Sequence, residues 1–270
     1  MRPIIYFFIN SNIWVACCVL GLAFSIEILL EAANYKISQF VFCSTIFAYN
    51  FQRLVRLKKG HNHFYKDWIE SNRKLIYILM ILAGGVSGHL FFGFKFSTQL
   101  AILLAGVISL FYPFLLRKIP FAKIFIVSFI WAVSTMLLLV LENDILISEN
   151  IIWQFISLFM FVFAITIPFD IRDVEYDLQN LKTMPLFFGV KRAKHIAFFA
   201  LLICGLISWY LHFKMFVNTP NLLALISLYI LACIFIQKSD KNNGKMYFSF
   251  WGESLSFCSY FLLVISESIF

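Results

Sequence analysis

Residues 150–189 read NIIWQFISLFMFVFAITIPFDIRDVEYDLQNLKTMPLFFG. The stretch opens with an apolar run at 150–169, which has the length of about 20 residues that a helix needs to cross a membrane core. Beside Pro168 it then passes into the densest cluster of charge in the chain, and a second long apolar run follows at 193–212. We therefore expect the chemistry of this protein to take place in the charged segment between the two runs.

The rest of the chain is dominated by apolar residues. Of its 270 residues, 61% are hydrophobic and only 13% are charged, and Phe alone supplies 34 positions. A soluble domain carries about twice that charged fraction. The composition therefore excludes an ordinary soluble domain and indicates an integral membrane protein.

The apolar runs predict an all-α fold. They are too long for strands and lack the alternation of an outer-membrane barrel, so the spanning elements must be helices that satisfy their own backbone groups. We predict a polytopic membrane helix bundle of about nine transmembrane helices, which forms a single domain over residues 1–270. The predicted spans lie near 13–33, 37–57, 74–93, 97–116, 121–141, 150–169, 193–212, 220–237 and 246–266.

The basic residues predict the orientation of the bundle, because Lys and Arg in short loops stay on the cytoplasmic side. With the N-terminus inside, all but three of the 22 Lys and Arg residues fall on the cytoplasmic side. The exceptions are Lys36, Lys95 and Lys214. We therefore expect a multi-pass protein of the bacterial cytoplasmic membrane whose charged segment faces the cytoplasm, and we attribute the net charge to lipid contact rather than to nucleic-acid binding.

Three aspartates of the charged segment are spaced i, i+3 and i+7: Asp170, Asp173 and Asp177. On one helix, their carboxylates would lie within about 60° of one another and would repel. A cation should therefore lie between them. Arg172 is predicted to project to the other face, so the better fit is Mg²⁺, which binds carboxylates together with the oxygens of a substrate phosphate. The three aspartates are thus predicted to be metal ligands and catalytic residues, and the alternative is that they only solvate a cytoplasmic loop and pair with basic neighbours.

Two stretches carry a resemblance to a known family. Residues 170–177 (DIRDVEYD), followed by 182–185 (KTMP) and Gly189, resemble the second aspartate-rich motif of the UbiA-type intramembrane prenyltransferases. Residues 112–118 (YPFLLRK) are similar to the tyrosine-proline stretch of the same family, which ends in basic residues. The resemblance implies a bundle around a central, lipid-open cavity, in which a Mg²⁺-bound prenyl diphosphate donates its isoprenoid chain to a lipid or aromatic acceptor.

The first aspartate-rich motif of the family is altered in this chain. At the corresponding place, residues 48–58 read AYNFQRLVRLK, so that Asn50 remains but every aspartate is missing. Guanidinium groups bind phosphate oxygens without a metal. We therefore predict a diphosphate-binding set made of Asn50, Arg53, Arg56, Arg117, Lys118 and Lys182. The alternative is that the two arginines of this stretch only anchor the helix to anionic headgroups.

Two other functions compete with prenyl transfer. A transporter would show ionisable residues near the middle of its spans, and the central parts of the predicted spans are apolar. A non-catalytic membrane protein that binds an isoprenoid diphosphate or lipid is the stronger rival, because it would explain the missing aspartates. The sequence identifies neither the acceptor nor the length of the prenyl chain.

Overall fold

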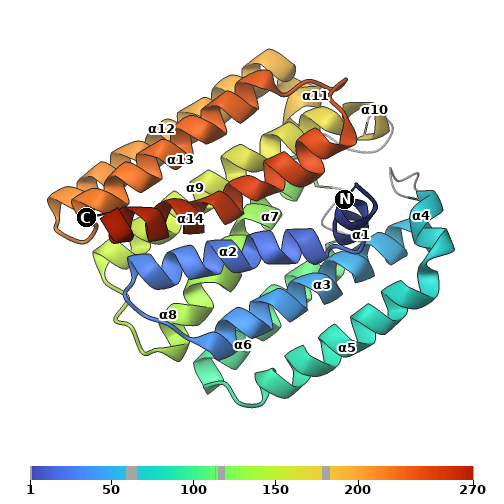
Figure 1. Ribbon diagram of the computed structural model, residues 1–270, viewed down its shortest axis with the longest axis horizontal. Helices are drawn as coiled ribbons and strands as arrows, with labels where there is room; N and C mark the ends of the chain where they lie inside the picture. Colours follow the sequence, from blue (N-terminus) through green and yellow to red (C-terminus); the bar gives the residue numbers. More distant parts are fainter. Residues whose placement is uncertain (1, 59–65, 113, 115–118, 178–182, 270) are drawn as a thin grey trace.

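The protein is a bundle of long helices, seen here in a computed structural model (Figure 1). The structure describes residues 2–58, 66–112, 114, 119–177 and 183–269, with the backbone alone at residues 2, 3, 176 and 177. Each predicted span coincides with a helix or with consecutive helical segments. These are α2 (Ile13–Leu29), α3 (Tyr35–Lys58), α5 (Arg73–Phe91), α6 (Phe96–Phe111), α7 (Ala122–Ala132) with η2 (Val133–Leu137) and α8 (Leu138–Glu142), α9 (Glu149–Arg172), α12 (Val190–Phe213), α13 (Thr219–Lys238), and η3 (Tyr247–Gly252) with α14 (Glu253–Ile269).

By length and composition, six of these helical rods can cross a membrane, or seven if the bent pair α1 (Arg2–Asn10) and α2 forms one span. Of the nine predicted spans, α3 and α6 are not among these candidates in the described part of the chain. Helix α6 has only 16 residues and would be about 24 Å long, shorter than a hydrocarbon core of roughly 30 Å. Helix α3 carries several polar and basic residues along its length. The protein is an integral, multi-pass membrane protein with an all-helical fold.

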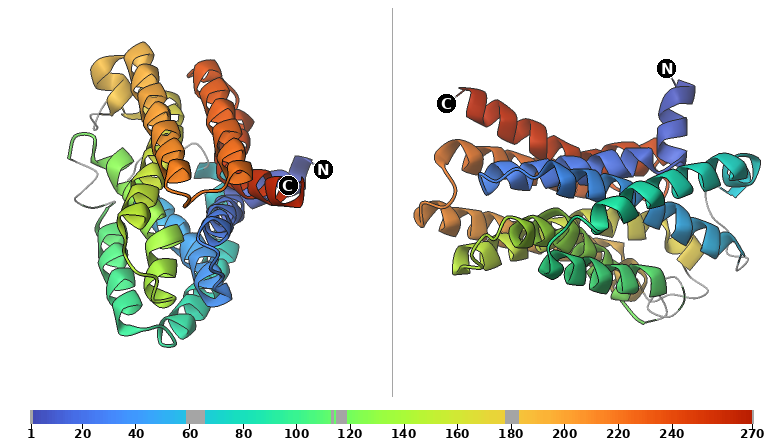
Figure 2. Two further views of the ribbon diagram at one scale, coloured as in Figure 1. Left: turned by 90° about the vertical axis from the view of Figure 1, so that its left-hand side faces the viewer. Right: turned by 90° about the horizontal axis from the view of Figure 1, so that it is seen from below.

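Four short helices lie at one end of the bundle: α1, α4 (Lys66–Ser71), α10 (Val174–Asp177) and α11 (Met184–Phe188) (Figures 1 and 2). The same end holds the last turns of α3 and α9 and the first turns of α7 and α14. Because the charged segment begins in the last turn of α9, we call this end of the bundle the Asp170 end.

Helix α9 lies centrally and packs against α7 and α12, while α2 packs against α3 and α14. Helix α9 begins after the N-cap residue Ser148, whose hydroxyl accepts a hydrogen bond from the backbone nitrogen of Ile151 at 3.4 Å. Most of its side chains from Phe161 to Ile171 are buried. Its last turn is therefore fixed in position by packing on both sides, and this turn presents the first acids of the charged segment.

Candidate functional site

The last turn of α9 brings two of the predicted aspartates together. Asp170 is in the final turn and its side chain is 1% exposed, while Asp173 caps the C-terminus of the helix with a side chain that is 24% exposed. An ionised carboxylate is costly to bury unless it is paired. Both acids have such a partner, and it comes from a different helix.

Lys123, in the first turn of α7, lies between the two carboxylates. Its Nζ is 2.6 Å from Oδ1 of Asp170 and 3.5 Å from Oδ2 of Asp173. The expectation that a cation lies between the aspartates is therefore confirmed. The cation in this structure is an ammonium group of the chain itself.

The predicted direction of Arg172 was wrong. Its Nε donates to Oδ1 of Asp173 at 2.7 Å and its Nη2 donates to Oδ2 at 3.0 Å, so the guanidinium binds the carboxylate in a bidentate way. The helical spacing argument fails here because α9 ends at Arg172, and the backbone of Asp173 leaves helical geometry with a ψ of 2°. The Arg172 guanidinium also lies over the rings of Phe169 and Phe248, at 5.4 and 5.8 Å from their centroids.

Arg56, near the end of α3, is a third cation that acts on these acids through its charge. It lowers the pKa of the Asp173 carboxyl, although it acts more weakly than the nearer cations. Burial alone would raise that pKa, but Arg172 and Lys123 outweigh burial and hold the pKa of Asp173 well below its usual value. We call the five residues Arg56, Lys123, Asp170, Arg172 and Asp173 the Asp170 cluster. It contains three basic and two acidic side chains.

Asn50 and Arg53 have a different position from the one predicted. The Asn50 amide donates to the carbonyls of Ser11 and Ile46, at 2.9 Å each, and accepts from the side chain of Asn12 at 2.8 Å. Nη1 of Arg53 donates to the Asn10 carbonyl at 2.6 Å.

These bonds hold the bend between α1 and α2, whose axes differ by 75°. The carbonyls at the end of α1 have no partner within that helix and need one from outside. Asn50 is completely buried and its hydrogen bonds give it a structural role, while its role as a diphosphate ligand stays a prediction. Arg53 is 9% exposed, which also contradicts its placement among lipid headgroups.

Several predicted site residues lie outside the described part of the chain. Arg117, Lys118 and Lys182 are among the residues that the structure does not describe, and for Asp177 only the backbone is described, as the last residue of α10. Their roles stay predictions. The backbone already shows that 170–177 is not one continuous helix, since α10 begins at Val174 after the break at Asp173.

The described residues do not fit the predicted Mg²⁺ site. Among the side chains that the structure describes, no three from His, Cys, Asp and Glu come close enough together to hold a metal. The two carboxylates of the Asp170 cluster are already matched by the Lys123 ammonium and the Arg172 guanidinium in direct contact. A dication placed between them would have to displace Lys123, because like charges so close together repel. As arranged here, Asp170 and Asp173 therefore do not fit a Mg²⁺ site, and the assignment of Mg²⁺ to Asp170, Asp173 and Asp177 together stays a prediction.

Two residues near this group were missed by the sequence reasoning. In the sequence, Lys123 contributes only to the set of basic residues that predict the topology. The signal that could have identified it is the need for a cation between the acids. Glu253, the first residue of α14, interacts electrostatically with Arg172 and Arg53. An acidic residue inside an apolar run is itself a pointer to a functional site, and Glu253 lies inside the predicted span 246–266.

Two aromatic side chains lie deeper in the bundle, on the helices that carry the cations. Nε1 of Trp131 on α7 donates to the Tyr49 hydroxyl of α3 at 2.9 Å. Trp131 follows Lys123 by eight residues and Tyr49 precedes Arg56 by seven, which places the pair about 10 Å below the cations along the helices. The arrangement combines charged groups at the rim with aromatic rings beneath them.

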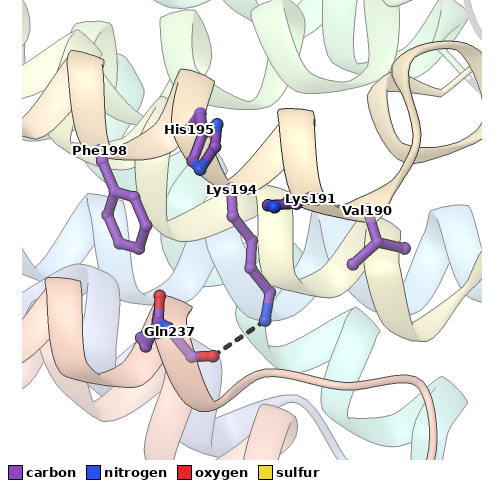
Figure 3. Close-up of a pocket in the computed structure, with 6 residues that line it drawn as sticks. All are labelled: Val190, Lys191, Lys194, His195, Phe198 and Gln237. Atoms are coloured by element: carbon purple, nitrogen blue, oxygen red, sulfur yellow. Dashed lines mark hydrogen bonds between the residues drawn. The ribbon is translucent and has the colours of Figure 1, made fainter.

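A pocket of about 340 Å³ opens elsewhere at the Asp170 end, between the start of α12 and the end of α13 (Figure 3). In this pocket Nζ of Lys194 donates to the backbone carbonyl of Gln237 at 2.9 Å. None of its lining residues belongs to the predicted site, and none is acidic. These residues are Val190, Lys191, Lys194, His195, Phe198 and Gln237.

The fold is shared with solved membrane proteins. A UbiA homolog from Aeropyrum pernix K1 aligns with a TM-score of 0.72 at 10% sequence identity, covering 94% of this chain and 97% of that protein. A UbiA homolog from Archaeoglobus fulgidus bound to GPP and Mg²⁺ aligns with a TM-score of 0.66 at 15% identity, covering 97% of this chain and 99% of that protein. None of the curated protein sequences matches this chain. At such low identities, the structural likeness shows a common fold.

The family is shown by the sequence itself. The sequence model of the UbiA prenyltransferase family matches residues 71–254, which is more than half of the chain. The match begins after α3, the helix that carries the altered 48–58 stretch, and it includes Lys123 and the acids of the Asp170 cluster. This chain therefore belongs to the UbiA prenyltransferase family.

Proposed function

We propose that this protein binds a prenyl diphosphate at the Asp170 cluster and transfers its isoprenoid chain to an acceptor in the membrane. The observation that carries the proposal is the concentration of Arg56, Lys123 and Arg172 around two acids at one end of a UbiA-family bundle. A diphosphate carries several negative charges, and both guanidinium and ammonium groups bind phosphate oxygens strongly. The family membership supports prenyl transfer as the reaction.

The cations would act on the departing group. In prenyl transfer the bond between C1 of the isoprenoid and the diphosphate oxygen breaks, and its electron pair leaves with the diphosphate. Preorganised cations lower the barrier because negative charge develops on that oxygen. A nucleophilic atom of the acceptor then bonds to C1, and the proton that it loses passes to the released diphosphate.

The aromatic pair beneath the cluster suits the allylic cation that forms at C1. An aromatic face stabilises a cation by about 0.5 to 2 kcal/mol, and the apolar surroundings exclude the water that would hydrolyse it. Tyr49 and Trp131 are fixed to each other by their hydrogen bond. We assign them to the wall along which the first isoprene units would lie in the predicted cavity.

The rival function is binding without transfer. The altered first motif favours it, because Asn50 and Arg53 now hold the α1–α2 bend instead of a ligand. A protein of this kind would hold an isoprenoid diphosphate or a related lipid at the same cluster. The two functions share one ligand chemistry and differ in whether diphosphate is released.

We further propose that the Asp170 end faces the cytoplasm of a bacterial cell. The distribution of basic residues supports this orientation. The proposed partners are therefore a prenyl diphosphate, a lipid or aromatic acceptor and membrane lipids, and a nucleic acid is not among them. A single domain over residues 1–270 also remains our prediction.

The test uses the purified full chain in lipid nanodiscs with radiolabelled prenyl diphosphates of several chain lengths and an extract of membrane lipids. We expect the label to appear in a lipid product and diphosphate to be released. Arg56→Gln should reduce both. Lys238→Gln is the matched control, since it removes an exposed lysine at the same end, at the last residue of α13.

Three outcomes separate the hypotheses. Release of diphosphate with labelled product supports the transferase. Tight binding with no release, in every lipid extract tried, overturns transfer in favour of the binding protein. Absence of binding for every prenyl diphosphate overturns both.

A further inference from the structure

We infer that the Lys123 ammonium occupies the place of a divalent cation, so that this chain binds the diphosphate of its ligand without a metal. The inference rests on the proposed function and concerns how the same site holds its ligand. It starts from the mismatch described above: the two acids that should hold a metal ion are joined to a lysine instead.

The first argument is geometric. A metal ion at such a site bridges protein carboxylates to phosphate oxygens. An ammonium group has three N–H donors arranged around one charge, so it can make the same bridge. Lys123 already spans the two acids, at 2.6 Å from Asp170 and 3.5 Å from Asp173. A phosphate oxygen approaching the cluster meets a cation that is already held in position.

The second argument is charge balance. In a metal-dependent site without its metal, neighbouring carboxylates repel each other and an incoming diphosphate. In the Asp170 cluster Lys123 and Arg172 balance the two acids, and Arg56 adds one further positive charge. Its five members therefore include one more basic than acidic side chain, which favours the approach of a polyanion.

The third argument is burial. The Lys123 side chain is 17% exposed and that of Asp170 only 1%. A buried carboxylate needs a partner of opposite charge, and Asp170 already has one in Lys123. A metal ion could take this place only by separating the buried pair.

The experiment measures binding of geranyl diphosphate to the full chain in nanodiscs by calorimetry, once with Mg²⁺ and once with excess EDTA. We expect the two dissociation constants to agree within about threefold, a difference of less than one kcal/mol. Thermal unfolding is followed in the same two buffers. The unfolding temperature should not change on addition of EDTA.

Two variants test whether Lys123 is the cation that matters. Lys123→Met should weaken binding in EDTA by at least about tenfold. In that variant Mg²⁺ should restore part of the affinity, because the freed carboxylates of Asp170 and Asp173 can hold a metal. Lys123→Arg keeps the charge and should bind in EDTA nearly as the parent protein does.

A spectroscopic readout is independent of ligand affinity. Mn²⁺ has an electron paramagnetic resonance signal that reports its binding, and it occupies Mg²⁺ sites. When geranyl diphosphate is present, adding the parent protein should not change the Mn²⁺ signal further. Lys123→Met should bind Mn²⁺, whereas a purely structural role of Lys123 predicts no gain of metal binding.

The failure of this inference is distinguishable from that of the proposed function. If geranyl diphosphate binds only when Mg²⁺ is present, the metal-free mode is wrong while the proposed function stands. If neither geranyl diphosphate nor longer prenyl diphosphates bind in either buffer, the proposed function is wrong and the inference loses its basis. Equal binding in both buffers, lost in Lys123→Met, supports both.

Discussion

Nζ of Lys123 lies 2.6 Å from the carboxylate of Asp170, so the first turn of α7 is joined to the last turn of α9 by a buried ion pair. The two residues are far apart in the sequence, and α7 and α9 also pack together along their lengths. The pair places a positive charge between two acids at the end of the bundle. It therefore contributes both to the stability of the helix packing and to the charge of the proposed site.

Asp170→Asn should destabilise the protein strongly. The change removes the nearer of the two described carboxylates from Lys123, and breaking a buried pair costs about 3 to 5 kcal/mol. We expect a clear drop in the unfolding temperature of the purified protein. The double variant Asp170→Asn with Lys123→Met removes both charges and should recover part of the loss. If the double variant is less stable than the sum of the single effects, the pair is not the source of the stability.

Asn50→Leu and Arg56→Gln should separate structure from ligand binding. Two of the described side-chain bonds of Asn50 reach the α1–α2 bend, at Asn12 and Ser11, so its loss leaves buried polar groups of the bend unpaired at about 1 to 3 kcal/mol each. We expect a lower unfolding temperature with an unchanged dissociation constant for geranyl diphosphate. Arg56→Gln should show the reverse pattern. Calorimetry and thermal unfolding on the same preparations check both, and weak binding by stable Asn50→Leu would return Asn50 to the ligand site.

Acid should weaken the protein through Asp173. Its pKa in the folded protein is lowered by Arg172 and Lys123, although burial acts the other way. Because the unfolded chain binds a proton at about pH 3.9, the resulting stabilisation is complete above that value and is lost as the pH falls towards the folded pKa. We expect the unfolding temperature to decrease once the pH is lowered below about 4. Asp173→Asn should be less stable at neutral pH and should show a smaller decrease in acid.

The orientation can be tested with single new cysteines in two exposed loops. Met215 follows α12 at the end opposite to the Asp170 end, and Asn242 follows α13 at the Asp170 end. A membrane-impermeant maleimide added to intact cells should label Met215→Cys, and it should label Asn242→Cys only after permeabilisation. The six native cysteines are buried or half-buried and provide the background. Labelling in the reverse order would place the Asp170 cluster on the outside.

Gly252 should tolerate no side chain. A Cβ at this position would lie 2.7 Å from the ring of Phe235 and 3.1 Å from that of Phe169, so the end of η3 approaches its neighbours more closely than any other residue would permit. Gly252→Ala should cost about 1 to 3 kcal/mol through overpacking. Gly205→Ala in α12 is the matched control, since its Cβ would meet nothing within 4 Å. Thermal unfolding should give a lower unfolding temperature for Gly252→Ala and an unchanged one for Gly205→Ala.

The helical fold could be predicted from the sequence because the requirement for long apolar helices is local. For α9 the predicted span 150–169 differs from the helix Glu149–Arg172 by only a few residues. The short helix α1 was missed because nine residues are too few to produce a spanning signal. Its bend against α2 depends on hydrogen bonds from α3, and such contacts across the fold leave no mark in the periodicity of the sequence.

The site could be predicted only in part, for the same physical reason. The spacing of Asp170 and Asp173 correctly placed their carboxylates near each other and required a cation between them. The identity of that cation was a long-range fact, because Lys123 reaches the acids only when α7 packs on α9. The position of Arg172 was mispredicted because a helical wheel describes the interior of a helix, and this residue is at its end.

The tethering of Lys123 to α7 also joins two events that are separate in a metalloprotein. A dissociable ion reaches its ligands after folding, and the fraction of sites that it fills follows its supply in the cell. A charge carried on a helix arrives with the helix, at a ratio of one to each molecule. Correct docking of α7 is thus the same step that charges the site, and starvation for magnesium would leave the occupancy of this position unaltered.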